Sequence, residues 1–237
     1  IWFEANGYQL AGGNDALDLA RQWLCEGKIV AAKGLGGYHL ACDAANTQAV
    51  ELLRIRKKRS DNPFSLMVPD LATIEKYCYV NDIERAFLVD EKAPILLLER
   101  KPDACLAPQI AINQHTYGFM LPYTPLHLLL MEKQPGFPEV LVMTSANLAE
   151  EPIAYQDNDA RDRLSQLADG FLLHNRDIHM RTDDSVLRIA RNQLYPIRRA
   201  RGYAPDPIRL PAPVKSVLAT GAALKNGFCL TRDHSAF

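Results

Sequence analysis

Val140-Leu-Val-Met-Thr-Ser-Ala-Asn147 joins a run of apolar residues to a polar turn. The four residues of 140–143 predict a buried strand, and Thr144, Ser145 and Asn147 follow it directly. Ligand-binding loops gather at the carboxyl ends of strands in α/β sheets. Two hydroxyls and an amide can hold phosphate or carboxyl oxygens, although an ordinary helix cap or Asx turn uses the same residue types.

Strand-like and helix-like segments alternate irregularly on both sides of this stretch. Short apolar runs predict strands over 29–32, 64–68, 94–98, 117–121 and 171–173, with a strand pair over 185–189 and 195–199. Capping residues and apolar spacing predict helices that start at Asn14 or Asp15, at Asn46 (through about Arg59), at Leu71 (to Tyr77), at Thr124 (to Lys133) and at Asp157 (to Leu167). Because the order is not strictly β-α-β, we expect an α/β fold with a twisted mixed sheet and flanking helices.

The length of 237 residues suits one large domain with additional segments. We expect 1–13 to end a preceding linker, 14–204 to form the domain, and 205–215 to form a stiff linker that contains four prolines. Residues 216–237 then read as the truncated start of another domain. The chain begins at Ile1 without a methionine and stops at Phe237 in an apolar stretch, so we expect a piece of a longer protein.

Composition excludes several classes of protein. Lys and Arg total 27 against 28 Asp and Glu, whereas nonspecific nucleic-acid binders are usually basic. The five cysteines form no C-x-x-C pair, which argues against a zinc ribbon and a disulfide framework. Residues 104–131 carry no Asp, Glu, Lys or Arg, but prolines and amides interrupt them, so they suit a core better than a membrane span. With no signal peptide, we expect a cytoplasmic protein.

Basic residues cluster in Arg54-Ile-Arg-Lys-Lys-Arg59, where five of six positions are cationic. Cations near the last carbonyls of a helix each contribute roughly 0.3–1 kcal/mol. That effect explains one or two such residues, and an anion site, most simply for a polyphosphate, explains five. Spacing alone leaves both interpretations open.

A second basic region runs from His174 to Arg201 and contains seven arginines, with Asp177, Asp183 and Asp184 between them. Surface ion pairs of little energetic value are one explanation. Phosphate binding is the other, and Asp183 or Asp184 could then hold Mg²⁺.

A glycine-rich segment, Lys33-Gly-Leu-Gly-Gly-Tyr-His39, follows a predicted strand. It matches neither the P-loop nor the dinucleotide-binding pattern, although its glycines permit close approach of a ligand. We interpret His39 as a structural histidine.

Several motifs together resemble the YrdC-like domain of the HypF family. They are 33–44 (KGLGGYHLACDA), 53–59 (LRIRKKR), 120–127 (MLPYTPLH), 142–148 (VMTSANL), 174–178 (HNRDI), 181–186 (RTDDSV) and 198–205 (RRARGYAP). The resemblance spans about residues 15–211, and Gly221–Leu230 is similar to the opening of the ASKHA-like domain that follows in that family. The family's acylphosphatase domain and its upstream zinc-finger region, where its zinc is held, have no counterpart here.

The resemblance implies ATP-dependent formation of carbamoyl-adenylate from carbamoyl phosphate, through carbamate. The carbamoyl group then passes to the C-terminal cysteine of HypE in cyanide-ligand synthesis for [NiFe]-hydrogenase. The family's K-x-R pair falls on Lys57 and Arg59, with Ser60 where proline is usual, and its S-x-N pair falls on Ser145 and Asn147. ATP and Mg²⁺ are implied, Thr144 belongs to the same polar turn, and Arg176, Ser185, Arg199 and Arg201 are candidates for the opposite wall.

Other functions fit the same sequence. A tRNA threonylcarbamoyl-adenylate synthase shares the fold, and a carbamoyltransferase acting on a small molecule would share the two-domain core. A noncatalytic module that binds double-stranded RNA is disfavoured by the net charge of −1. A docking scaffold for HypE would need no chemistry in this segment.

Overall fold

A computed structural model describes residues 1–148, 151–221 and 227–237. Its strands are β1 (Trp2–Ala5), β2 (Tyr8–Gly12), β3 (Val30–Lys33), β4 (Tyr38–Asp43), β5 (Ser65–Met67), β6 (Ile95–Glu99), β7 (Thr116–Met120), β8 (Leu141–Ser145), β9 (Gly170–Leu173), β10 (Val186–Ala190), β11 (Gln193–Arg198), β12 (Ile208–Val214), β13 (Leu218–Thr220) and β14 (Phe228–Ala236). The helices are α1 (Asn14–Cys25), α2 (Thr47–Arg56), α3 (Leu71–Tyr77), α4 (Asp82–Leu88), α5 (Pro125–Leu130) and α6 (Asp157–Leu164), with a 3₁₀ turn at Pro108–Ile110.

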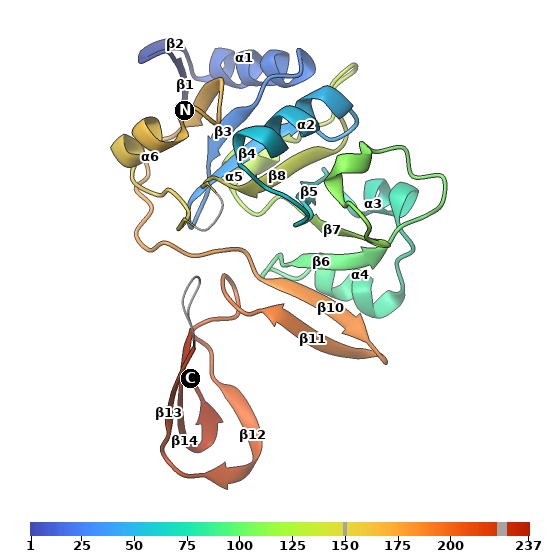
Figure 1. The fold of residues 1–237 in the computed structure, drawn as a ribbon, viewed down its shortest axis with the longest axis vertical. Helices are drawn as coiled ribbons and strands as arrows, with labels where there is room; N and C mark the ends of the chain where they lie inside the picture. The colour runs from blue at the N-terminus through green and yellow to red at the C-terminus, as the bar shows by residue number, and fades with distance from the viewer. Residues whose placement is uncertain (149–150, 222–226) are drawn as a thin grey trace.

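An 11-stranded sheet in the order β11-β10-β6-β7-β5-β8-β4-β3-β9-β1-β2 forms the body of the molecule. Three neighbouring pairs (β3 with β9, β5 with β7, and β6 with β10) are parallel, and the described remainder is antiparallel. Helices flank this sheet, while β12, β14 and β13 make a small sheet below β10 and β11 (Figure 1). The expected mixed sheet with flanking helices is confirmed.

Apolar side chains alternate between the two faces of the sheet, as the pleat requires. Leu40 and Val142 pack with Leu53 of α2 in one core cluster. Their neighbours Ala41 and Met143 belong to a second cluster, which includes residues of α1 and α5. Helix α2 therefore covers one face, and consecutive residues at the end of β8 point to opposite sides.

Several element boundaries differ from those expected. Asn46 caps α2 as predicted, its side chain accepting from Ala49 N at 3.1 Å, but the helix ends at Arg56 and not near Arg59. Gly13 precedes α1 without a side-chain cap, so neither Asn14 nor Asp15 caps that helix. Helices α5 and α6 each end three residues before the predicted end.

The two segments expected to be linkers form strands. Residues 2–12 make a hairpin through Asn6 and Gly7, and β1 pairs with β9 in the main sheet. Phe3 is fully buried there and meets the ring of Trp23 edge-on at 5.0 Å. The proline-rich segment contributes β12, which pairs with β14. Part of the Gly221–Leu230 segment, 222–226, lies outside the described residues.

In the described part of the chain, no helix is both long enough and apolar enough to cross a membrane.

Candidate functional site

The end of α2 and the end of β8 meet, although they lie far apart in the sequence. The ammonium of Lys57, which is 2% exposed, donates to the backbone oxygens of Ser145 and Asn147, each at 2.6 Å. Arg59 Nη1 donates to Thr144 Oγ1 at 3.3 Å. The structure therefore brings together five of the nine residues that were predicted to bind the ligand.

Three consecutive cations, Lys57, Lys58 and Arg59, lie in a turn at the end of α2, and the turn points their side chains in different directions. Lys58 has a φ of 51°, and its N–H donates to Ile55 O at 3.0 Å, while Arg59 N–H donates to Arg54 O at 3.1 Å. This pair of bonds is a Schellman motif, in which a left-handed residue follows the helix. Lys57 is buried and Lys58 is exposed as a result.

The surroundings of Arg59 are electropositive. Burial, together with the nearby charges of Arg54 and Arg198, lowers the pKa of Arg59 to about 10. Among the described residues, its hydrogen bonds end on neutral oxygens of Asn62, Pro63 and Thr144. An anion placed here would offset the cost of gathering these cations.

Hydrogen bonds within the turn fix the polar groups that follow β8. Ser145 Oγ donates to Asn147 Oδ1 at 2.8 Å. Asn147 Nδ2 donates to the backbone oxygens of Leu148 and Glu151, at 2.9 and 2.7 Å. The hydroxyl and the amide are therefore held in place before any ligand arrives.

The sequence suggested that Ser185 and Arg201 line the opposite wall of the site, but both side chains are engaged within the protein. Ser185 is fully buried, and its hydroxyl donates to Arg201 O at 2.9 Å and accepts from Ala200 N at 2.8 Å. The Arg201 guanidinium donates to Asp184 Oδ1 at 2.8 Å and to the backbone oxygens of Lys92 and Ala93. Both side chains already serve protein partners.

The two remaining wall candidates have no described contact with Arg59. Arg176 is exposed, and the guanidinium of Arg199 donates to the backbone oxygen of Asp206. Their role in binding stays a prediction. Arg198, which the site prediction omitted, is the arginine of this segment whose charge acts on Arg59. To choose Arg198 over Arg199 from the sequence, one would have to know the register in which the two predicted strands pair.

Asp184 is not available as the magnesium ligand that we expected. His39 Nε2 lies 2.9 Å from Asp184 Oδ2, and Tyr123 and Arg201 donate to Oδ1 at 3.0 and 2.8 Å. Burial would raise the pKa of Asp184, but His39 and Arg201 outweigh it and hold the pKa far below its usual range. The backbone oxygen of Asp183 accepts from Arg201 N at 3.1 Å.

The described residues contain no group of three or more His, Cys, Asp or Glu side chains arranged to hold a metal ion.

The glycines of the 33–39 segment allow close packing of protein against protein. A Cβ on Gly36 would lie 2.4 Å from Thr182 Cγ2, and one on Gly37 would lie 2.5 Å from Ile153 Cδ1. Tyr38 N also donates to Ala154 O at 2.8 Å. The glycine turn is thus a docking point for two later segments of the chain.

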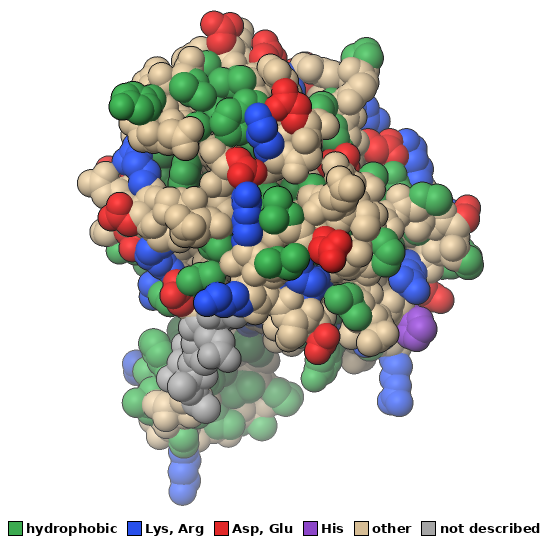
Figure 2. Space-filling view, turned by 45° about the horizontal axis from the view of Figure 1, so that its top comes forward, with side chains coloured by type: hydrophobic (Ala, Val, Ile, Leu, Met, Phe, Trp, Pro, Cys, Tyr) green, Lys and Arg blue, Asp and Glu red, His purple; other side chains and the backbone are tan. Residues whose placement is uncertain are grey.

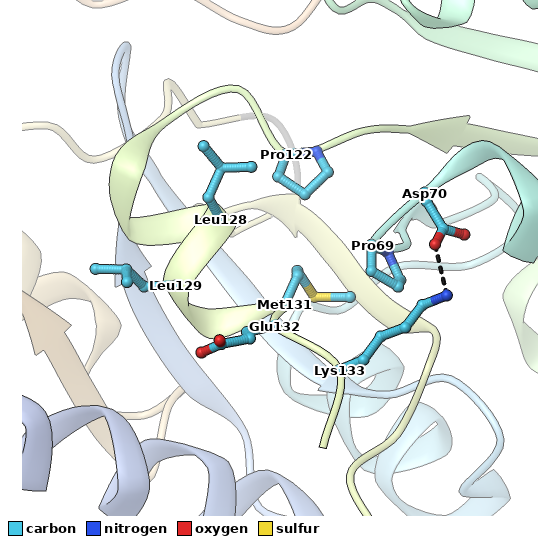
Figure 3. Close-up of a pocket in the computed structure, with 8 residues that line it drawn as sticks. All are labelled: Pro69, Asp70, Pro122, Leu128, Leu129, Met131, Glu132 and Lys133. Atoms are coloured by element: carbon cyan, nitrogen blue, oxygen red, sulfur yellow. Dashed lines mark ion pairs between the residues drawn. The ribbon is translucent and has the colours of Figure 1, made fainter. Parts of the chain in front are cut away.

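A hollow of about 330 Å³ lies beside α5 and contains none of these residues (Figure 3). Its lining consists of Pro69, Asp70, Pro122, Leu128, Leu129, Met131, Glu132 and Lys133. On the face shown in Figure 2, Lys and Arg side chains are interspersed with Asp and Glu. That face therefore shows no extended basic surface.

Comparison with known proteins places the chain among relatives that share this fold. A family model described as telomere recombination (Sua5/YciO/YrdC) matches residues 22–200. A carbamoyltransferase HypF of Synechocystis is 43% identical over 237 residues, which are 100% of this chain and 30% of that protein. A threonylcarbamoyl-AMP synthase of Bacillus subtilis is 28% identical over 71% of the chain and 50% of its own length.

Solved structures of HypF proteins have the same fold as this chain. Full-length HypF in a phosphate- and nucleotide-bound form has a TM-score of 0.89 and 45% identity, covering 99% of this chain and 30% of that one. T. kodakarensis HypF has a TM-score of 0.91 and 38% identity, covering 100% and 31%. The chain spans about 30% of the length of these HypF proteins. It belongs to the Sua5/YciO/YrdC family, and throughout its length it is similar to the corresponding part of HypF carbamoyltransferases.

Proposed function

We propose that this chain binds ATP and carbamate and joins them into carbamoyl-adenylate, with release of pyrophosphate. The observation that carries the proposal is the contact between the end of α2 and the end of β8, where Lys57 and Arg59 meet Thr144, Ser145 and Asn147. The similarity to HypF solved in a phosphate- and nucleotide-bound form supports a nucleotide as the ligand.

The chemistry asks for positioning and charge neutralisation. A carbamate oxygen attacks the α-phosphorus of ATP, the bond from that phosphorus to the bridging oxygen breaks, and pyrophosphate leaves. Such transfers gain most from alignment and electrostatic stabilisation. Lys57 and Arg59 would neutralise the phosphates. The Ser145 hydroxyl and the Asn147 amide would exchange the hydrogen bonds that they make within the turn for bonds to phosphate or carbamate oxygens. Magnesium, bound with the triphosphate, would supply further positive charge.

The longer relatives suggest where the substrate and the product belong. HypF proteins are named carbamoyltransferases, so we propose that carbamate arises from carbamoyl phosphate outside the region described here. The activated carbamoyl group would pass to the C-terminal cysteine of HypE. Enclosure protects the adenylate from water until this transfer.

The main alternative is a threonylcarbamoyl-adenylate synthase. The 28% identity to the B. subtilis synthase favours it, and it requires threonine together with bicarbonate. ATP consumption that depends on threonine would support this alternative, and dependence on ammonia with bicarbonate, which form carbamate in solution, supports the proposal.

Exchange of labelled pyrophosphate into ATP, driven by ammonium bicarbonate, tests the proposal. Lys57→Gln and Arg59→Gln should each lower the exchange rate at least about 10²-fold, as expected when a charged donor to the transition state is lost. Lys58→Gln, which removes the same charge from an exposed neighbour, is the matched control and should stay near the wild-type rate. Equal rates in all three variants would refute the site.

A further inference from the structure

His39 stands beside Ser145 on the neighbouring strand. The two residues are directly opposite in the antiparallel pair of β4 and β8, so their side chains share one face of the sheet, with Cβ atoms roughly 4.5–5.5 Å apart. Ser145 is half-buried, whereas His39 is 2% exposed. Any group that Ser145 Oγ holds on this face therefore lies next to the imidazole.

The imidazole of His39 is braced on several sides. Its Nε2 lies 2.9 Å from Asp184 Oδ2. The ring of His127 meets it edge-on at 5.6 Å, and that of Tyr123 does so at 6.4 Å. On the side of Nδ1, a Cβ added to Gly34 would lie only 2.9 Å away. The ring has little room to move aside for a bulky neighbour.

Asp184, which holds the ring, is itself fixed. Its other carboxylate oxygen accepts from Tyr123 and Arg201, and the guanidinium of Arg201 lies 3.5 Å from the centre of the Tyr123 ring. A buried carboxylate with three donors keeps one geometry, because each lost partner would leave a charge or a dipole unpaired. The position of His39 is therefore determined by a network and not by packing alone.

We propose that His39, held by Asp184, sets the size limit for the co-substrate at Ser145, and this rests on the function proposed above. The unsubstituted carbamate carries no group on nitrogen that would meet the imidazole. A carbamate with a substituent on nitrogen must displace a ring that cannot yield. His39 is thus a specificity-determining residue that separates carbamate from N-substituted carbamates such as that of threonine.

A graded series of amines tests the assignment. Bicarbonate with ammonia, methylamine or threonine gives carbamates of increasing size, and each is supplied to the pyrophosphate-exchange assay with the KM measured. In the wild type, the KM for methylcarbamate should exceed that for carbamate at least about tenfold, the usual effect of one extra carbon in a tight pocket. In His39→Ala, the two values should lie within roughly threefold, with the Kd for ATP unchanged.

His115→Ala is the matched control, because it removes an exposed imidazole that makes none of the contacts described above. It should keep the wild-type preference. Should His39→Ala fail to fold, His39→Asn, which is smaller than the ring and keeps a polar group near Asp184, carries the same prediction.

A wild type that accepts both carbamates equally would overturn the assignment, and so would a His39→Ala that discriminates as the wild type does. Absence of exchange with every amine, in a wild type that is folded, contradicts the proposed function itself.

Discussion

The ammonium of Lys57 lies 2.6 Å from the backbone oxygen of Asn147, across ninety positions of sequence. With a second bond to Ser145 O, Lys57 ties the turn after β8 to the end of α2. The same residue thus orders the site and supplies charge to it.

Replacing Lys57 with methionine should destabilise the fold. The side chain keeps its length, but two carbonyl oxygens lose a charged donor, at a cost of about 1.5–3 kcal/mol in the free energy of unfolding. Urea unfolding measures this value. Lys58 is an exposed neighbour, so Lys58→Met should change the free energy of unfolding by less than about 0.5 kcal/mol. Equal effects of the two substitutions would show that the hydrogen bonds of Lys57 do not stabilise the fold.

The hairpin of residues 2–12 should stabilise the domain. Phe3 is fully buried against Trp23, so Phe3→Ala should lower the free energy of unfolding by about 3–5 kcal/mol. Leu10→Ala on the same hairpin removes a side chain that is 51% exposed and should have little effect. A loose linker would tolerate both substitutions alike.

Gly36→Ala should loosen the contact between the glycine turn and the segment before β10. The added Cβ would lie 2.5 Å from the backbone oxygen of Thr182, which cannot move as a side-chain tip can, and overpacking of this kind costs roughly 1–3 kcal/mol. Gly12→Ala, where the nearest atom would be Gln9 Nε2 at 3.5 Å, is the control. Thermal melting of the two variants decides whether this contact is tight.

His127 should make stability depend on pH. Burial, aided by the charge of His39, lowers the pKa of His127 to about 3, whereas the unfolded chain has a histidine pKa of about 6.5. Below about pH 6.5 the unfolded state binds a proton that the folded state does not, so stability falls as the pH falls towards 3. The slope from this residue reaches about 1.4 kcal/mol per pH unit.

His127→Leu removes that proton uptake. The variant should therefore show a shallower loss of unfolding free energy between pH 6.5 and 4 than the wild type, measured by urea titration at each pH. Parallel curves for the two proteins would contradict the neutral, buried state of His127.

Much of the sheet was predictable because its strands are short apolar runs between turn residues. The runs at 64–68, 94–98 and 171–173 correspond to β5, β6 and β9. Strand β4 was missed because its buried face includes His39, which interrupts the apolar pattern. Here a polar side chain is accommodated by a partner 145 positions away, Asp184, which no local pattern reveals.

Two missed elements did carry local signals. Asn6-Gly7 is a strong hairpin dipeptide, and both residues adopt positive φ, at 51° and 78°. Asn81 and Glu84 form a capping box at the start of α4. These signals are short and lie outside the long apolar runs.

For the site, residue types alone did not decide whether the basic run 54–59 stabilises the end of a helix or binds an anion. The family resemblance paired Lys57 and Arg59 with Ser145 and Asn147. The structure places Lys57 in contact with Ser145 and Asn147, and Arg59 in contact with Thr144. The hydroxyl of Ser185 is occupied by hydrogen bonds to the backbone of residues 200–201, which are distant in the sequence. Sequence spacing does not contain that information.

A crystal structure of this chain with ATP and Mg²⁺ tests the central claim most directly. We predict density for the triphosphate between 57–59 and 144–147, with phosphate oxygens within hydrogen-bond distance of Lys57 and Arg59. A nucleotide bound with its phosphates elsewhere, for example in the hollow beside α5, would contradict the account.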